Sequence, residues 1–133
     1  MIEYISTEKS PLELGAFSQA VKAGGFLITS GIAPVDPATR KVIGDTVEEQ
    51  VRICYEHLKA ILEAAGASIG YLVKVNVYLA DIDDYPAVDR LWGELFPRPR
   101  PCRGLHALPW TKEKPCPGWE GIFVELSAIA YLG

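Results

Sequence analysis

The sequence is poor in cysteine and histidine, the residues on which disulfide scaffolds and many metal sites depend. It contains three cysteines and two histidines among 133 residues, and an odd, small cysteine count does not fit a disulfide framework. No apolar run approaches the roughly 20 residues of a membrane-spanning helix. Residues 1–5 lack the basic flank and the apolar core of a signal peptide. We therefore expect a soluble, cytoplasmic protein without a membrane partner.

The sequence also lacks a large excess of either charge. Thirteen basic and 17 acidic side chains leave a net charge of −4, which disfavours RNA as a general partner. Hydrophobic residues make up 49% of the chain and charged residues 23%, a composition far from that of disordered proteins. A chain of this length supports one hydrophobic core. We expect a single domain over residues 1–133.

The first part of the sequence predicts short strands followed by a loop. Gly24 and Gly25 supply the positive φ that a tight turn between two strands requires. Pro34 and Pro37 interrupt residues 32–40, which we expect to form a loop because proline cannot donate to a strand ladder. The predicted strands cover residues 2–5, 17–21 and 26–30.

Residues 46–65 have the three- and four-residue spacing of apolar side chains that is typical of an amphipathic helix. Thr46 and Glu49 have the spacing of a capping box, in which each side chain satisfies a free backbone amide of the first turn. Gly66 suits the left-handed conformation that ends many helices. The predicted buried stripe comprises Val47, Val51, Cys54, Leu58, Ile61, Leu62 and Ala65.

The second half of the sequence predicts a strand, a helix and two further strands. Asp84 is the expected cap of this helix, Pro86 fits its first turn and Pro97 ends it. Together the elements define an α+β fold with a mixed or antiparallel sheet and both helices packed on one of its faces. The predicted strands cover residues 73–79, 100–107 and 122–131, with Val73, Val75, Val77 and Leu79 on one face of the first; the helical stripe comprises Val88, Leu91, Trp92, Leu95 and Phe96.

Glu125 is the most informative single residue. It is the only ionisable side chain between Ile122 and Ile129, in a segment predicted to be a strand. Desolvation of a carboxylate favours its neutral form and brings its pKa closer to the range useful for proton transfer. The alternative is a surface glutamate, or one that is paired with an arginine. We take Glu125 as a candidate proton carrier.

Arg100 and Cys102 are two residues apart, so their side chains would share one face of a strand. The planar fork of arginine suits a carboxylate ligand, and a nearby guanidinium favours a cysteine thiolate. Alternatively, Arg100 is a charge at the rim of the protein and Cys102 a small filler of its core.

Two further groupings have weaker support. Basic residues concentrate between Arg98 and Lys114, which indicates either an anion site or an ordinary solvated loop. Cys102, His106 and Cys116 could supply three metal ligands, but no Cys-x-x-Cys pair accompanies them. Cys102 and His106 also have the residue types of a thiol nucleophile and its base, yet an extended strand separates them by about 13 Å.

These features together resemble the Rid family of reactive-intermediate imine deaminases, over essentially the whole chain. Each motif is weak alone, but their order and spacing are specific. The matching segments are residues 15–21 (GAFSQAV), 28–31 (ITSG), 63–66 (EAAG), 73–79 (VKVNVYL), 100–102 (RPC) and 124–130 (VELSAIA).

The resemblance implies a chorismate-mutase-like fold assembled as a homotrimer with sites between subunits. It implies hydrolysis of 2-imino acids, or of their enamine tautomers such as 2-aminoacrylate, to 2-keto acids and ammonia without a metal or a cofactor. These intermediates are released by pyridoxal-phosphate enzymes. By position, Arg100 would bind the substrate carboxylate and Glu125 would activate water. Cys102, Ser30 and Gly31 would line the site.

The chain departs from the family pattern in three places. Phe17, which we count among the substrate-binding residues, stands where family members carry a tyrosine that hydrogen-bonds near the substrate. Pro101 replaces a small residue and removes a backbone donor. Residues 110–121 are longer than the connection usual in the family. Two other functions stay open: a single-stranded endoribonuclease, and a non-catalytic trimer that binds small acids or acts like a chaperone.

Overall fold

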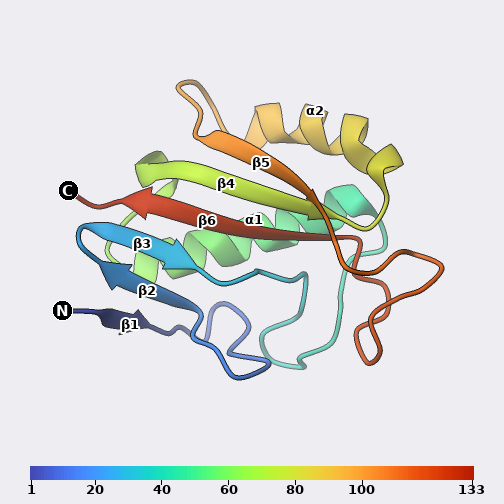
Figure 1. Cartoon of the computed structure of the whole chain (residues 1–133), viewed down its shortest axis with the longest axis horizontal. Coiled ribbons are helices and arrows are strands. Elements are labelled where there is room, and N and C mark those ends of the chain that lie inside the picture. The colour runs from blue at the N-terminus through green and yellow to red at the C-terminus, as the bar shows by residue number, and fades with distance from the viewer.

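A computed structural model describes all 133 residues, and its single sheet is mixed. The strand order is β1-β2-β3-β6-β4-β5, with β4 and β5 parallel and every other pair antiparallel. Both helices lie on the same side of this sheet (Figure 1), as predicted for an α+β fold. The elements are β1 (Glu3–Ile5), β2 (Ala20–Ala23), β3 (Phe26–Thr29), α1 (Val47–Ala64), η1 (Ile69–Tyr71), β4 (Leu72–Leu79), η2 (Ile82–Asp84), α2 (Tyr85–Leu95), β5 (Cys102–Ala107) and β6 (Val124–Tyr131).

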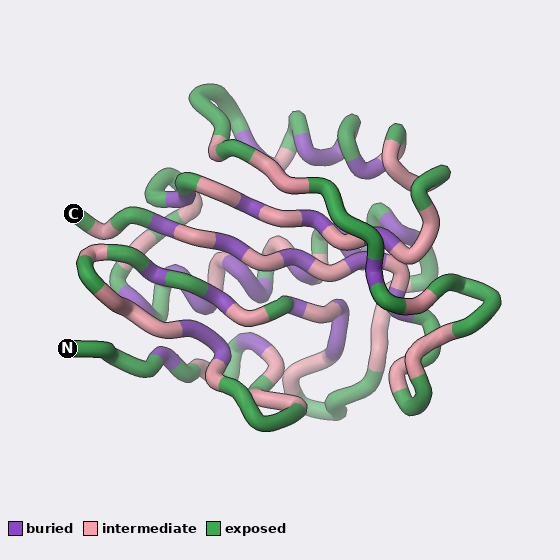
Figure 2. The backbone as a smooth tube through the Cα atoms, viewed as in Figure 1, coloured by how far each residue is buried: buried purple, intermediate pink, exposed green.

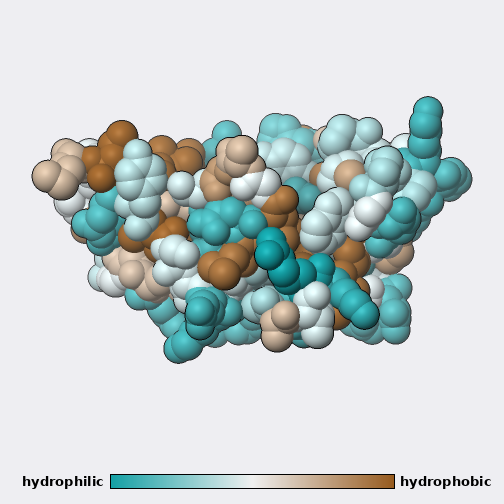
Figure 3. All heavy atoms as spheres, turned by 90° about the horizontal axis from the view of Figure 1, so that it is seen from below, coloured by the Kyte–Doolittle hydropathy of each residue, from teal (hydrophilic) through white to brown (hydrophobic).

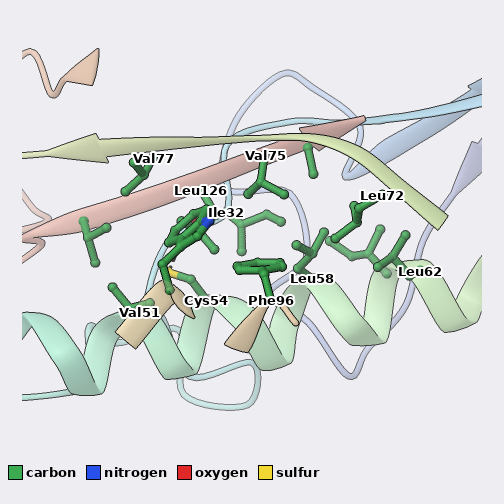
Figure 4. Close-up of a cluster of buried hydrophobic side chains, with 14 of the residues drawn as sticks. Ile32, Val51, Cys54, Leu58, Leu62, Leu72, Val75, Val77, Phe96 and Leu126 are labelled. Atoms are coloured by element: carbon green, nitrogen blue, oxygen red, sulfur yellow. Dashed lines mark hydrogen bonds between the residues drawn. The ribbon is translucent and has the colours of Figure 1, made fainter. Parts of the chain in front are cut away.

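The core lies between the sheet and the two helices. In Figure 4 the side chains of Val75, Val77 and Leu126 descend from the strands toward Cys54 and Leu58 on α1. Every residue of the stripe predicted for α1 is buried. The stripe of α2 is buried as well, except that Leu95 is only partly covered. No helix in the structure is both long and apolar enough to cross a membrane.

The ends of α1 follow the predicted signals in all but one detail. The Thr46 hydroxyl accepts a hydrogen bond from the Glu49 amide at 3.1 Å, and Gly66 has a φ of +79°. The Glu49 carboxylate, however, accepts from the Asp45 amide at 2.9 Å rather than from Thr46. The glutamate of this capping box therefore binds the amide of the residue before the cap and not that of the cap itself. The two side chains still satisfy two free backbone amides.

One residue of β4, Val73, was predicted to face the core with Val75 and Val77 but faces outward. Leu72 lies opposite Ala130 on β6, but Lys74 lies opposite Ile129, so two residues of β4 advance for one of β6. This bulge turns Val73 outward, leaving 42% of it exposed, while Leu72 is buried in its place. A local pattern of alternating valines cannot reveal a bulge, because the bulge depends on the partner strand.

Several predicted boundaries were also wrong, and one correctly placed cap residue lacks its capping hydrogen bond. Strand β2 begins three residues after Phe17, and β6 begins two residues after Ile122. Asp84 stands at the cap position of α2 but makes no capping hydrogen bond with its side chain. Its carboxylate instead binds Lys112, with the nitrogen 3.0 Å from Oδ2. A long-range ion pair thus replaces the local contact that the sequence suggested.

The face of the sheet that the helices do not cover carries exposed hydrophobic side chains. Figure 2 shows buried and half-buried positions alternating along β4 and β6, as expected for strands with one face in the core. On the uncovered face Phe26, Ile28 and Tyr131 remain 41%, 44% and 52% exposed. Figure 3, which looks onto the β1 side, shows hydrophobic side chains gathered at the end where the N-terminus lies in Figure 1. We call the face of the sheet opposite the helices, which carries Phe26, Ile28 and Tyr131, the open sheet face.

Candidate active site

Glu125 lies on the open sheet face between two fully buried neighbours. Val124 and Leu126 point into the core, so the strand alternation turns Glu125 to the other side, where it is half-buried. No protein donor hydrogen-bonds its carboxylate, and burial raises its pKa above the usual value. The buried Cys54 thiol has a pKa raised well above normal, first by its own burial and then by the negative charge of Glu125. Glu125 is therefore a carboxylate available to a ligand.

Gly31 lies directly beside this carboxylate. Ile32 exchanges two backbone hydrogen bonds with Leu126, at 2.6 and 3.1 Å, which brings the segment after β3 against β6. A Cβ atom at position 31 would stand only 3.0 Å from Oε1 of Glu125. A glycine at this position thus leaves the room that the carboxylate occupies.

Ser30 and a buried glutamine hold the neighbouring loop in place. The Ser30 hydroxyl donates to the Ser18 carbonyl at 2.6 Å. The Gln19 side chain is 4% exposed, accepts from the Thr7 amide at 2.8 Å and donates to the Pro11 carbonyl at 2.6 Å. Because a buried amide without partners is costly, these bonds stabilise one conformation of the loop. That conformation carries Phe17 to the site.

A cleft of about 340 Å³ forms around Glu125. It brings together four of the predicted site residues: Phe17, Ser30, Gly31 and Glu125. Four further residues in its wall were not predicted as site residues; only Trp119, an aromatic in the long connection, had a sequence signal. The complete lining is Leu14, Phe17, Ser30, Gly31, Ala33, Trp119, Ile122 and Glu125.

Arg100 does not reach this cleft, and it does not lie on a strand as predicted. It precedes β5, where its Nε donates to the Phe96 carbonyl at 2.7 Å and an Nη to Gly93 at 3.3 Å. These bonds satisfy carbonyls at the end of α2, and the other guanidinium N–H groups stay free. Arg100 is exposed and lines a separate cleft of about 430 Å³ beside Arg103 and Asp89.

Cys102 is also remote from Glu125 within one chain. It opens β5 opposite Lys74, whereas Glu125 lies opposite Tyr78 four residues further along β4. Four residues along the strands and two strand spacings across the sheet separate the Cα atoms by about 16 Å. The Cys102 thiol is exposed and donates to the Val73 carbonyl, at the bulge, at 3.1 Å. One chain therefore has two separate surfaces. The first, which we call the acid–cleft half, contains Glu125 and its cleft; the second, which we call the arginine half, contains Arg100 and Cys102.

Comparison with known proteins identifies the chain. Residues 7–131 match the family model described as Endoribonuclease L-PSP. A RutC family protein of Pyrococcus abyssi is 37% identical over 132 residues, which cover 97% of this chain and 96% of that protein. The chain belongs to the Rid/L-PSP family.

Two further similarities extend this result. The 2-iminobutanoate/2-iminopropanoate deaminase of Salmonella typhimurium is 41% identical over 96 residues, covering 72% of this chain and 74% of that enzyme. The crystal structure of RidA from an Antarctic Psychrobacter superposes with a TM-score of 0.83 at 33% identity, covering 97% of this chain and 98% of that one. The fold predicted from the resemblance is confirmed at the level of the α+β architecture.

The weaker groupings do not form sites in this Rid protein. No three His, Cys, Asp or Glu side chains come close enough to hold a metal, so Cys102, His106 and Cys116 are not a ligand set. His106 instead stacks on Tyr78 with ring centres 5.0 Å apart. In the basic segment between Arg98 and Lys114, Arg103 forms an ion pair with Asp89 at 2.8 Å. The charge of Arg103 is therefore neutralised within the chain and is less available to bind an anion.

Proposed function

We propose that this Rid protein hydrolyses 2-imino acids to 2-keto acids and ammonia. The observation that carries the proposal is the free Glu125 carboxylate, whose pKa is raised by burial, in an apolar cleft beside Gly31. A raised pKa shortens the gap to neutral pH, where a group that must both accept and return a proton works best. The Salmonella relative, named as an imine deaminase, supports the same class of reaction.

The residues suit the chemistry. A protonated imine carbon is already electrophilic, so the reaction needs an oriented water and one proton carrier. In our proposal the Glu125 carboxylate accepts a proton as the water oxygen bonds to that carbon. It returns the proton to the nitrogen, the C–N bond breaks with its electron pair leaving on ammonia, and loss of the hydroxyl proton yields the keto acid. No other reactant is consumed.

The substrate carboxylate needs a partner that the Glu125 cleft itself does not supply. No arginine or lysine is among the residues lining it. Arg100 has free guanidinium N–H groups in the fork geometry that suits a carboxylate, but it lies at the far end of the same sheet. We therefore assign this role to Arg100 of a neighbouring subunit, with Cys102 beside it.

The open sheet face is the surface through which such subunits would pack. Antiparallel sheets that face water carry polar side chains on that side, whereas this one exposes Phe26, Ile28 and Tyr131. Cyclic assembly places the same two patches of each copy against each other. In a homotrimer, each acid–cleft half would then meet the arginine half of the next subunit, giving three sites.

A ribonuclease, the activity in the name of the family model, has less support. RNA binding depends on free cations, and Arg103 and Lys112 are both ion-paired within the chain. Acid–base cleavage by a histidine pair is also not available. The His57 ring is buried against the Val35 carbonyl, and His106 lies on the open sheet face.

The test is keto-acid release from freshly generated imine. A dehydratase acting on serine would supply 2-aminoacrylate, and semicarbazide would trap the imine that escapes hydrolysis. We expect the protein to accelerate keto-acid formation and Glu125→Gln to reduce kcat/KM by about 100-fold or more. Glu113→Gln, an exposed carboxylate outside the cleft, is the matched control. Equal rates for Glu125→Gln and the unchanged protein would exclude the proposed role of Glu125.

A further inference from the structure

The long connection of residues 110–121 is an ordered unit. The Thr111 amide donates to the Lys114 carbonyl at 3.2 Å, and the Lys114 amide returns a bond to the Thr111 hydroxyl at 3.0 Å. Further along, the Trp119 amide donates to the Cys116 carbonyl at 3.0 Å. These short-range bonds give the segment a defined shape, although it contains no helix or strand.

The segment is also attached firmly at both ends. At its start, the Trp110 indole N–H donates to the Ile122 carbonyl at 3.0 Å. At its end, the fully buried Gln50 of α1 donates to the Gly121 carbonyl at 2.6 Å and accepts from the Phe123 amide at 2.8 Å. Buried hydrogen bonds of this kind are expensive to break, so the connection is held against the body of the protein.

An ion pair adds a third attachment. The Lys112 ammonium lies 3.0 Å from a carboxylate oxygen of Asp84 and 3.7 Å from one of Asp81. It also lies 5.2 Å from the centre of the Phe123 ring. The hydrogen bond to Asp84 raises the pKa of Lys112, which further favours the charged form that this ion pair requires.

This attached segment places Trp119 in the wall of the Glu125 cleft. The indole is half-buried and shares the wall with Leu14, Phe17 and Ile122, all of which are apolar. Phe17 is 49% exposed in the free protein, so an apolar ligand would cover ring surface that is now in water. The apolar part of the cleft is larger than its polar part, which includes Ser30 and Glu125.

We propose that Trp119 and Phe17 form an apolar subsite that makes 2-imino acids with bulky hydrocarbon side chains the preferred substrates. The inference rests on the proposed deaminase function and adds the class of side chain. A cleft of about 340 Å³ has room for roughly ten water molecules, which is more than the whole of 2-iminopropanoate, with its three carbons, one nitrogen and two oxygens, would displace. Leucine- and phenylalanine-derived imines would fill it and exclude water from around Glu125.

The size of the expected preference follows from known apolar pockets. One methylene in a hydrophobic pocket changes kcat/KM by roughly 10-fold or more. Because part of the cleft is open to solvent, we expect the leucine-derived imine to exceed the alanine-derived imine by about 10-fold to 100-fold in kcat/KM. Trp119→Ala should reduce this ratio by about 10-fold, mainly by slowing the bulky substrate.

The experiment measures three imines with the same variants. An L-amino acid oxidase would produce the imines from leucine, phenylalanine and alanine, with catalase present, and semicarbazide would compete for them. Trp119→Phe keeps an apolar ring and should keep the preference. Lys114→Ala, on the exposed side of the same connection, is the control. Lys112→Met removes an attachment but no wall residue, and should lower the ratio while Trp119 is still present.

The outcomes separate the two hypotheses. A ratio near one in the unchanged protein, or a ratio that Trp119→Ala leaves intact, would overturn the apolar subsite while deamination stands. Absence of turnover for all three imines would instead overturn the proposed function. Circular dichroism of each variant establishes that it folds. If Trp119→Ala does not fold, Lys112→Met keeps the test decisive, because an unchanged ratio in that variant would also overturn the apolar subsite.

Discussion

Gly31 and Glu125, which are 94 positions apart in the sequence, are packed so closely that even a methyl side chain at position 31 would press on the carboxylate. A methyl group at position 31 would stand 3.0 Å from Oε1 of Glu125. Gly31 has no positive φ, so this glycine is required for space and not for backbone conformation. The contact connects the segment after β3 to the proton carrier on β6.

Gly31→Ala should therefore impair catalysis more than stability. The added methyl would shift the Glu125 carboxylate by a few tenths of an ångström. Because a misplacement of about 1 Å costs about 100-fold in rate, we expect kcat/KM to fall by roughly 3-fold to 10-fold. The measurement is kcat/KM for imine hydrolysis together with a thermal melt. Gly70→Ala is the control, because a Cβ there meets only the Ser68 hydroxyl at 3.9 Å. Unchanged turnover in Gly31→Ala would contradict this account of the site.

The pH dependence of stability should reveal the desolvated carboxylate. Burial raises the Glu125 pKa in the folded state, so folding disfavours its ionised form. Its contribution to stability is greatest below the usual glutamate pKa and is lost as the pH rises through the higher folded value. Glu125→Gln should therefore be more stable than the unchanged protein at pH 7, with a smaller difference well below pH 4.5.

Urea unfolding at the two pH values measures this effect. Glu113→Gln controls for the removal of one carboxylate from the surface. A Glu125→Gln variant that is less stable at neutral pH would show that the carboxylate has a favourable partner in the folded protein, contrary to the structure.

Mixing two inactive variants should restore activity if each site is shared between subunits. Arg100→Ala keeps Glu125, and Glu125→Gln keeps Arg100, so a site that joins one chain of each kind has both groups. Random assembly of an equal mixture would restore about a quarter of the sites. The measurement is imine hydrolysis after the two variants are unfolded and refolded together, with separately refolded samples as controls. Arg98→Ala, two positions from Arg100, should be active alone.

The outcome of the mixing experiment has a clear reading when combined with the molecular mass. A trimer by light scattering without restored activity would place Arg100 and Glu125 in different sites. A monomer that hydrolyses imine would exclude the shared site altogether.

Among the polar residues, we expect replacement of Gln50 to reduce the free energy of unfolding the most. Its side chain is fully buried and bonds to Gly44, Gly121 and Phe123. Gln50→Leu keeps a similar volume but leaves these backbone groups without partners, at a cost of about 3 kcal/mol. The midpoint of thermal unfolding should fall by roughly 10 °C. Glu63→Gln, exposed on the same helix, should change stability by less than about 0.5 kcal/mol.

The sequence by itself determined the elements and the face on which Glu125 lies. Side-chain periodicity depends on backbone geometry over a few residues, and it predicted α1, β6 and the buried stripes with errors of only a few residues at most ends. The same argument isolated Glu125 as the single charge in an apolar strand. The bulge at Val73 was missed because it arises from the pairing with β6.

Only the tertiary structure decided which distant residues meet. It brought Gly31, Phe17 and Trp119 to Glu125, and it separated Arg100 from that cleft. The sequence had predicted a strand over residues 100–107 with Arg100 and Cys102 on one face, but the strand begins only at Cys102. Loops have no repeating pattern to predict them; their course depends on buried side chains such as Gln19 and Gln50, whose partners lie far away in the chain. Local spacing therefore specifies a residue's direction from the backbone, whereas its neighbours depend on long-range packing.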